Sequence, residues 1–494
     1  MLETEAANSP VHPHTPPWQQ PLPQDPALRE QVEQYKEKSL LLDIREPGYM
    51  DDIVMNPAYT ASPRLWLAFL IIGVGCIVMG ITWFYQMIGG IGIYGIARPV
   101  MWAVYIVNLV YFIGIGHAGT FISAAFRALK IQFRAPISRP AELLTVFGLA
   151  TAGMQVFFHL GRAWKALWVG PYPNFRGLWP SYHSPLAWDL IAISTYLSCS
   201  ALFAFLALIP DLAMARDREQ RPGWRKRLYE IASLGFRGTE REWTVHTRAM
   251  DIFTYAIIPV MFSVHTIVSW DFAMALQPSW HSTVFGPYFV VGALYSGAAA
   301  VILILMIIRK FMHLEFFIRN EHMNGMAMFL LILSFTWAYF FFNDYIVPWY
   351  GQDPAEKLLF YRFIHGPFPY NAVWWGLILC NIVIPWGTLW RRKWRTSPFV
   401  LLLAGVAVNV GMYLERVMII PLGLSVNELP FDWGVYRLQL PETLITIGSF
   451  CLVLFMFFLF VRFFPIIPVW EVKEGQEQHR LRQVGRALVD TRVE

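Results

Sequence analysis

The sequence has 494 residues, of which 56% are hydrophobic, 16% aromatic and only 15% charged. A water-soluble protein carries about a quarter charged residues, so this composition excludes an ordinary soluble enzyme and predicts an integral membrane protein. The formal net charge of +5 is less informative than the distribution of the charges along the chain.

The first 63 residues are polar and include a proline-rich segment, SPVHPHTPPWQQPLPQDP. This segment lacks the apolar core that a cleavable signal peptide needs, so no such signal is expected. Proline favours an extended backbone, and we predict a cytoplasmic arm that either lies on a neighbouring surface or is disordered.

Ten apolar segments follow the arm, and each is close to the roughly 20 residues that a helix needs to cross a bilayer. Only helices and closed barrels satisfy all backbone groups in lipid, and segments this continuously apolar are predicted as helices. The predicted spans are 65–87, 99–126, 143–160, 187–209, 249–270, 285–308, 325–345, 371–390, 398–420 and 442–462. The sequence therefore predicts an all-α protein with a ten-helix transmembrane domain over residues 64–463 and a charged cytoplasmic tail over 464–494.

The eight central spans form two comparable sets, spans 2–5 and spans 6–9. The segment GIGHAGTFISAAF in span 2 loosely echoes VVGALYSGAAAV in span 6. Small residues let helices pack closely, and paired repeats are common in membrane proteins. We therefore predict two four-helix bundles, with spans 1 and 10 as flanking helices.

Lysine and arginine are divided unequally between the loops at the two ends of the spans. The loops after spans 2, 4, 6 and 8 hold 20 basic residues, whereas the loops after spans 1, 3, 5, 7 and 9 hold 7. Basic loops favour the cytoplasm, so the asymmetry predicts that both termini are cytoplasmic. The opposite loops are rich in aromatic residues, which suits both the membrane interface and a surface that docks other proteins.

The hairpin between spans 3 and 4, HLGRAWKALWVGPYPNFRGLWPSYHSPLAWD, begins with His159 and ends with Asp189. A hairpin places these two side chains at one depth, near the outer face. Oxidation of a quinol releases two protons and two electrons; a neutral histidine can accept one proton, and a carboxylate can hold the other or orient the ring. Arg162 lies one helical turn after His159 and could hold the aspartate charge. The aromatic and hydroxyl side chains expected to support such a pocket are Tyr182, Ser184 and Trp188. The alternative is a structural polar pair at the membrane interface.

Other ionisable residues within the spans are candidates for a proton path, because charges at bilayer depth are costly. They are His117, Asp251, His265, Asp271, Asp344, Glu415 and Arg416. Each has a simpler interpretation. The buried histidines can be satisfied core residues, Asp271 can be solvated, and the adjacent Glu415 and Arg416 can form structural ion pairs.

Some chemistry is excluded for this chain by its motifs. The four cysteines are Cys76, Cys199, Cys380 and Cys451, and no CxxC or CxxCH pattern indicates an iron–sulfur cluster or a c-type haem. No span carries two histidines at the spacing of a bis-histidine haem b site, so neither haem nor a bound metal is expected. Nucleotide-binding motifs are absent, and the basic loop at 211–248 is explained by orientation rather than by nucleic-acid binding.

The ten-span plan, the HLGRAWKALW…SPLAWD hairpin and the WYGQDPAEKLLFYRFIHGPF loop resemble the NrfD/polysulfide-reductase-type membrane subunits over residues 40–465. The ten-span form with a polar N-terminal arm is most similar to the ActC-type subunits of bacterial alternative complex III. The resemblance implies a bacterial inner-membrane subunit that oxidises menaquinol or ubiquinol near the periplasmic face and carries no redox cofactor itself. It implies that the quinol site includes His159 and Asp189. The implied partners are a periplasmic iron–sulfur subunit, multihaem cytochrome c subunits and a homologous ten-helix sister subunit.

The favoured interpretation is therefore a quinol-oxidising membrane subunit that passes electrons to an iron–sulfur partner, with proton translocation as a further expectation. One alternative is a secondary transporter, which would share the repeats but should contain helices broken at the midplane. In this chain the prolines fall mostly near span ends, with Pro259 and Pro385 as exceptions. The other alternative is a purely structural membrane anchor for a redox complex.

Overall fold

The computed structural model describes most of the chain. The described residues are 49–59, 63–169, 185–219, 221–278, 280–315, 317–477, 479–484 and 487–492. Most of the predicted N-terminal arm lies outside the described residues, as do Tyr182 and Ser184 of the predicted quinol pocket.

Ten helices among the described residues are long and apolar enough to cross a bilayer, which confirms the predicted fold class. They are α3 (Pro63–Gly89), α4 (Val104–Ala128), α5 (Ala135–Leu160), α6 (Pro185–Arg218), α8 (Glu240–Ala273), α9 (Phe285–Phe311), α10 (Asn320–Gly351), α12 (Tyr370–Ile378) with α13 (Ile384–Leu389), α15 (Pro398–Val417) and α16 (Leu440–Val461). A π-helical segment, η5 (Leu379–Val383), joins α12 to α13, and a second, η6 (Met418–Leu422), extends α15.

Several helices extend beyond their predicted spans. α5 begins at Ala135 rather than near residue 143, and α6 and α8 each have 34 residues. A helix of that length is about 51 Å long, whereas the hydrocarbon core is about 30 Å thick. Polar helical turns therefore continue into the headgroup region, where hydropathy gives no signal.

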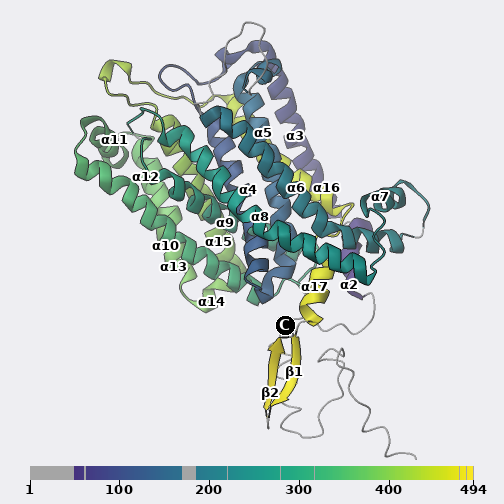
Figure 1. Cartoon of the computed structure of the whole chain (residues 1–494). Coiled ribbons are helices and arrows are strands. Elements are labelled where there is room, and N and C mark those ends of the chain that lie inside the picture. The colour runs from purple at the N-terminus through teal and green to yellow at the C-terminus, as the bar shows by residue number, and fades with distance from the viewer. Residues whose placement is uncertain are drawn as a thin grey trace, which may run out of the picture.

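The helices form two four-helix bundles with two flanking helices (Figure 1), as predicted. The first bundle contains α4, α5, α6 and α8, and the second contains α9, α10, α12–α13 and α15. α4 packs on α9 between them, where a Cβ atom at Gly297 would lie only 2.2 Å from the Ala118 Cβ. The two small-residue segments noted in the sequence therefore meet and allow this close approach. α3 pairs with α16 at the side of the first bundle.

Shorter elements lie at the two ends of the bundles (Figure 1). One end, called the α7 end, carries α2 (Tyr49–Tyr59), α7 (Trp224–Ala232), α14 (Arg392–Arg395), α17 (Val469–Glu477) and the antiparallel strands β1 (His479–Val484) and β2 (Ala487–Arg492). The opposite end, called the α11 end, carries η2 (Ile91–Ile93), η4 (Ala163–Trp168), α11 (Pro354–His365) and η7 (Pro430–Asp432). The strand hairpin in the tail was not predicted from the sequence.

Candidate functional site

The end of α5 carries His159, and the residue before it anchors this helix end. The backbone carbonyl of Phe158 accepts hydrogen bonds from Gln86 Nε2 and the Tyr94 hydroxyl, both at 2.8 Å. Tyr105 in turn donates to Gln86 Oε1 at 2.6 Å. These three polar side chains are buried, so they fix the backbone from which His159 projects.

Gly161 ends α5 two residues after His159. Its φ of +67° lies in the left-handed region that favours glycine, and a Cβ there would come within 3.0 Å of the Ile91 side chain. Arg162 follows with an exposed side chain. In the part of the chain that the structure describes, Arg162 makes no ion pair with Asp189.

Two Trp-Asp pairs meet at the α11 end, one at the start of α6 and one at the end of α8. The rings of Trp188 and Trp270 lie 6.1 Å apart, edge to face. The carboxyl groups of Asp189 and Asp271 lie within hydrogen-bond distance of each other. Asp189 is only 8% exposed, and two carboxyl groups this close repel each other unless they share a proton. We therefore expect the pair to hold one proton between its oxygens.

His159 and Asp189 lie at the same end of two antiparallel helices that pack against each other. No hydrogen bond or ion pair joins them among the described residues, and the carboxyl partner of Asp189 is Asp271 instead. Asp189 Oδ1 has no hydrogen-bond partner there either. The open acceptor and the imidazole are both available to a hydroxylated ligand at this end of the bundle.

A histidine pair lies deep within the first bundle. His117 of α4 and His265 of α8 are fully buried, with their rings 4.5 Å apart. The ring of Tyr196, from α6, stacks on His117 at 4.5 Å. His117 Nδ1 bonds to the Ile113 carbonyl at 3.0 Å, whereas its Nε2 and both ring nitrogens of His265 have no partner among the described atoms. Such ring nitrogens can bind water or carry protons.

Glu415 and Arg416 form a buried ion pair where the two bundles meet. Glu415 also accepts a hydrogen bond from the Tyr288 hydroxyl of α9. The Arg416 guanidinium lies 4.7 Å from the centre of the Phe289 ring, and the His265 ring lies 6.1 Å from that same ring. Phe289 therefore lies between the histidine pair of the first bundle and the charges of the second.

Asp344 lines a pocket of about 330 Å³ at the α11 end. Aromatic side chains, among them Tyr345 and Phe360, form part of its wall. Within the same lining, His281 Nε2 lies 3.0 Å from Glu356 Oε1. Burial raises the pKa of Glu356, and the nearby His281 opposes that shift. The second bundle therefore also has titratable groups at the α11 end.

The α7 end of the first bundle contains a network of charges. Arg127 pairs with Asp251 at 3.3 Å and with Glu471 at 3.8 Å. Glu471 belongs to α17, is 2% exposed and also pairs with Arg134 at 2.9 Å. Asp251 is 55% exposed, so it joins the network to the surface.

Two buried carboxyl groups in this network have different partners. Asp211 pairs with Arg139 at 2.6 Å, and both side chains are 2% exposed. Glu142 Oε1 accepts a hydrogen bond from Ser123 Oγ at 2.5 Å, while its Oε2 has no hydrogen-bond partner among the described atoms. Glu142 is therefore the carboxyl group in this region without an arginine at salt-bridge distance in the described structure.

The structure connects His117 to this network along α4. Thr120, Ser123 and Arg127 follow His117 at steps of three or four residues and are buried or nearly so. This spacing places them on one helix face that runs from the bundle interior to the α7 end. The stripe was not predicted because serine and threonine are unremarkable in an apolar span, and the helical period was the signal that could have revealed it.

The cysteines and the acidic and histidine side chains were the candidates for metal ligands. In the described part of the chain, no cluster of three or more His, Cys, Asp or Glu side chains is arranged to hold a metal ion. The four cysteines are free thiols on different helical segments. The titratable groups described above can form hydrogen bonds and exchange protons.

Comparison with known proteins gives two matches. The family described as polysulphide reductase, NrfD, matches residues 94–427. A protein of Halobacterium salinarum, whose description by inference is a membrane component of dimethyl sulfoxide reductase, is 22% identical over 378 residues. That alignment covers 74% of this chain and 79% of the relative. The family match includes both bundles and begins near η2, so it covers the α5, α6 and α8 ends that carry the candidate site.

Proposed function

The chain belongs to the NrfD polysulphide reductase family of membrane subunits in reductase-type redox complexes, and we propose that it is the quinol-oxidising subunit of an oxidoreductase like alternative complex III. Menaquinol or ubiquinol enters from the bilayer and binds at the α11 end. We assign this end to the periplasmic face of a bacterial inner membrane, because the opposite loops hold most of the basic residues.

The observation that carries the proposal is the Asp189–Asp271 carboxyl pair, which lies at the same end of the first bundle as His159. A quinol hydroxyl can donate to a carboxylate oxygen or to a neutral imidazole. Trp188 and Trp270 meet edge to face beside the pair and offer an apolar wall for a flat ring. Tyr182 and Ser184 stay predictions for this pocket, because they lie outside the described residues.

The reaction removes two protons and two electrons from the quinol and leaves a quinone. His159 accepts one proton, and the Asp189–Asp271 pair accepts the other, because the pair has room for a second proton when both carboxyl groups become neutral. The electrons pass one at a time to an iron–sulfur cluster in a periplasmic partner. The proposed complex also contains multihaem cytochrome c subunits and a homologous ten-helix sister subunit.

Proton translocation is the second part of the proposal. The α4 stripe leads from Arg127 to His117 and then to His265 in the middle of the first bundle. Glu415, Arg416 and Asp344 offer a continuation through the second bundle toward the α11 end. Water between the unpartnered ring nitrogens would supply the missing hydrogen bonds.

The transporter alternative gains no support from the helix geometry. α8 runs without a break through Pro259, and the span that contains Pro385 continues from α12 through η5 into α13. A secondary transporter is expected to have helices broken at the midplane. Isolation of the chain alone with solute uptake activity would favour that alternative; iron–sulfur and cytochrome proteins that copurify with bound quinone support the oxidoreductase.

The test uses the purified complex with His159→Ala or Asp189→Asn. Positioned acid–base groups contribute at least about a hundredfold to rate, so quinol oxidation should fall by that factor while the set of proteins in the complex is unchanged. Glu428→Gln is the matched control, because Glu428 is exposed in the loop after η6, at the same end. Full turnover in either site variant would refute the assignment, and it would leave a structural anchor as the remaining alternative.

A further inference from the structure

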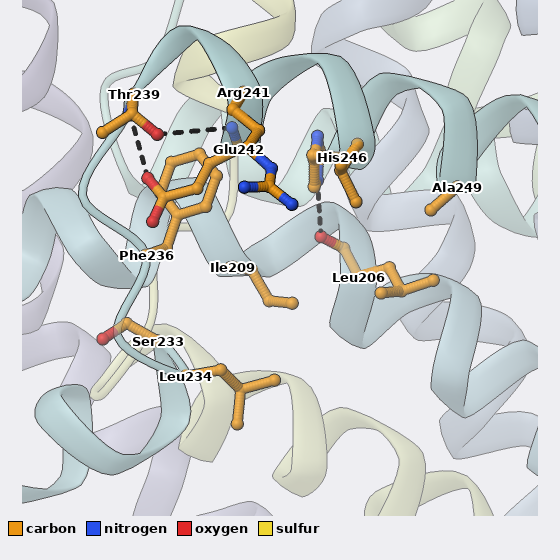
Figure 2. Close-up of a pocket in the computed structure, with 11 residues that line it drawn as sticks. Leu206, Ile209, Ser233, Leu234, Phe236, Thr239, Arg241, Glu242, His246 and Ala249 are labelled. Carbon is orange, nitrogen blue, oxygen red and sulfur yellow. Dashed lines mark hydrogen bonds between the residues drawn. The ribbon is translucent and has the colours of Figure 1, made fainter.

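A groove at the α7 end is unrelated to the proposed quinol site. It has a volume of about 500 Å³ and lies between α6, the turn after α7 and the first turns of α8 (Figure 2). Apolar side chains form most of its wall, including Leu206, Ile209 and Val245. Arg241 is a charged lining residue of this groove.

The depth of the groove follows from the lengths of its helices. α6 and α8 have 34 residues each, whereas about 20 suffice to cross the hydrocarbon core. The first turns of α8 therefore lie at headgroup level, and Leu206 and Ile209 of α6 lie near the edge of the hydrocarbon. The groove thus extends from acyl-chain depth to the aqueous boundary.

The side chains around the groove are suited to lipid contact. Trp224 and Ile231 of α7 are 64% and 67% exposed, although Tyr229 between them is fully buried. Leu234, in the turn that follows, is 69% exposed and Val245 is 61% exposed. Exposed apolar residues at the end of a membrane bundle are expected to lie in the bilayer interface, where α7 would be an amphipathic surface helix.

Arg241 supplies a charge without a protein counter-ion. No carboxylate in the described structure lies within salt-bridge distance of its guanidinium. The neighbouring Glu242 is already engaged, because its carboxylate accepts the backbone N–H groups of Arg237 and Thr239, each at 3.0 Å. Figure 2 shows the Arg241 side chain and the capped Glu242 on the same first turn of α8. The segment 221–248 carries seven basic and three acidic residues, so the local field favours an anion.

We propose that this groove binds one anionic phospholipid of the leaflet at the α7 end. The lipid phosphate contacts Arg241, and one acyl chain lies along Leu206, Ile209 and Val245. A phosphate at headgroup depth supplies the missing counter-ion, and a chain at hydrocarbon depth covers the apolar wall. Neither a free anion nor an apolar chain alone satisfies both parts of the groove.

The test uses the purified complex in nanodiscs of phosphatidylcholine that contain a few per cent of phosphatidylglycerol with a photoactivatable acyl chain. After irradiation, peptides that contain residues 206–249 should carry the lipid. Arg241→Gln should lower this labelling about fivefold, and Arg241→Lys should retain most of it. Arg392→Gln is the control, because Arg392 is an exposed basic residue at the same end.

Three results would overturn the proposal. Equal labelling by photoactivatable phosphatidylcholine would show that the site does not select an anion. Displacement of the labelled lipid by 10 mM inorganic phosphate would assign the site to free phosphate. Labelling unchanged in Arg241→Gln would exclude the charge contact. Quinol oxidation is not the readout, so failure here would leave the proposed function untouched.

Discussion

Glu142 allows a direct test of whether the α7 end of the first bundle handles protons. Its side chain is 1% exposed, and Ser123 is its hydrogen-bond partner in the described structure. Three arginines nearby are balanced by three other carboxylates. These ion pairs involve Arg127, Arg134 and Arg139 with Asp251, Glu471 and Asp211. A fourth carboxylate would have no counter-ion, so we expect Glu142 to hold a proton at neutral pH.

The substitution Glu142→Gln should then cost little stability. An amide replaces a neutral acid of nearly the same shape and can keep the Ser123 contact, so the free energy of unfolding should change by less than about 1 kcal/mol. Asp211→Asn provides the contrast, because it removes the carboxylate 2.6 Å from Arg139 in a pair that is 2% exposed on both sides. Breaking a buried ion pair costs about 3–5 kcal/mol. Thermal denaturation of the purified complex should rank the two variants clearly.

Function should show the opposite ranking for Glu142→Gln. In proteoliposomes, quinol oxidation without a proton gradient should stay within about twofold of the unmodified complex, because Glu142 lies at the end of the bundle away from His159. The number of protons translocated per electron should fall at least about tenfold, since positioned proton-transfer groups contribute at least that much to rate. Destabilisation equal to that of Asp211→Asn would show that Glu142 is ionised, and unchanged translocation would remove it from the path.

Three further substitutions test the α11 end. Tyr94→Phe removes a buried donor to the Phe158 carbonyl; it should cost about 1 kcal/mol of stability and slow quinol oxidation several-fold, as measured by melting and turnover. Asp271→Asn removes one acid of the carboxyl pair and should slow turnover at least about tenfold, with unchanged turnover contradicting a shared proton. Trp270→Ala removes an edge-to-face contact worth about 1 kcal/mol; it should raise the KM for quinol more than it lowers kcat, whereas an equal loss in both would argue against a wall contact.

The membrane spans could be predicted because lipid imposes a simple requirement on the chain. Each helix must be apolar for about 20 residues, so hydropathy locates α3 or α16 without further information. The same criterion failed for the first turns of α5, which contain Arg139 and Glu142 and were placed in a loop. Those turns are stabilised by packing and ion pairs at the α7 end rather than by lipid, and hydropathy cannot report that.

The candidate site was predicted only in part, for a physical reason. His159 and Asp189 could be placed at one depth because a hairpin joins their spans. The partner of Asp189 is Asp271, which comes from α8 and is brought to α6 by tertiary packing. Likewise, Gln86 and Tyr94 bind a backbone carbonyl beside His159, and a bond to the main chain leaves no residue pattern at its acceptor.

The polar groups also constrain the route that a translocated proton could take. From Arg127 the α4 stripe reaches His117 over ten residues, or about 15 Å along the helix, so the histidine pair lies near mid-membrane. Beyond His265 the next charged group toward the second bundle is Arg416, and Phe289 lies between them. A continuous hydrogen-bonded chain cannot pass through a phenyl ring. Translocation along this route therefore requires the Phe289 ring to move or water to pass beside it. This makes the contact between α8 and α9 the place where quinol oxidation would have to control proton passage.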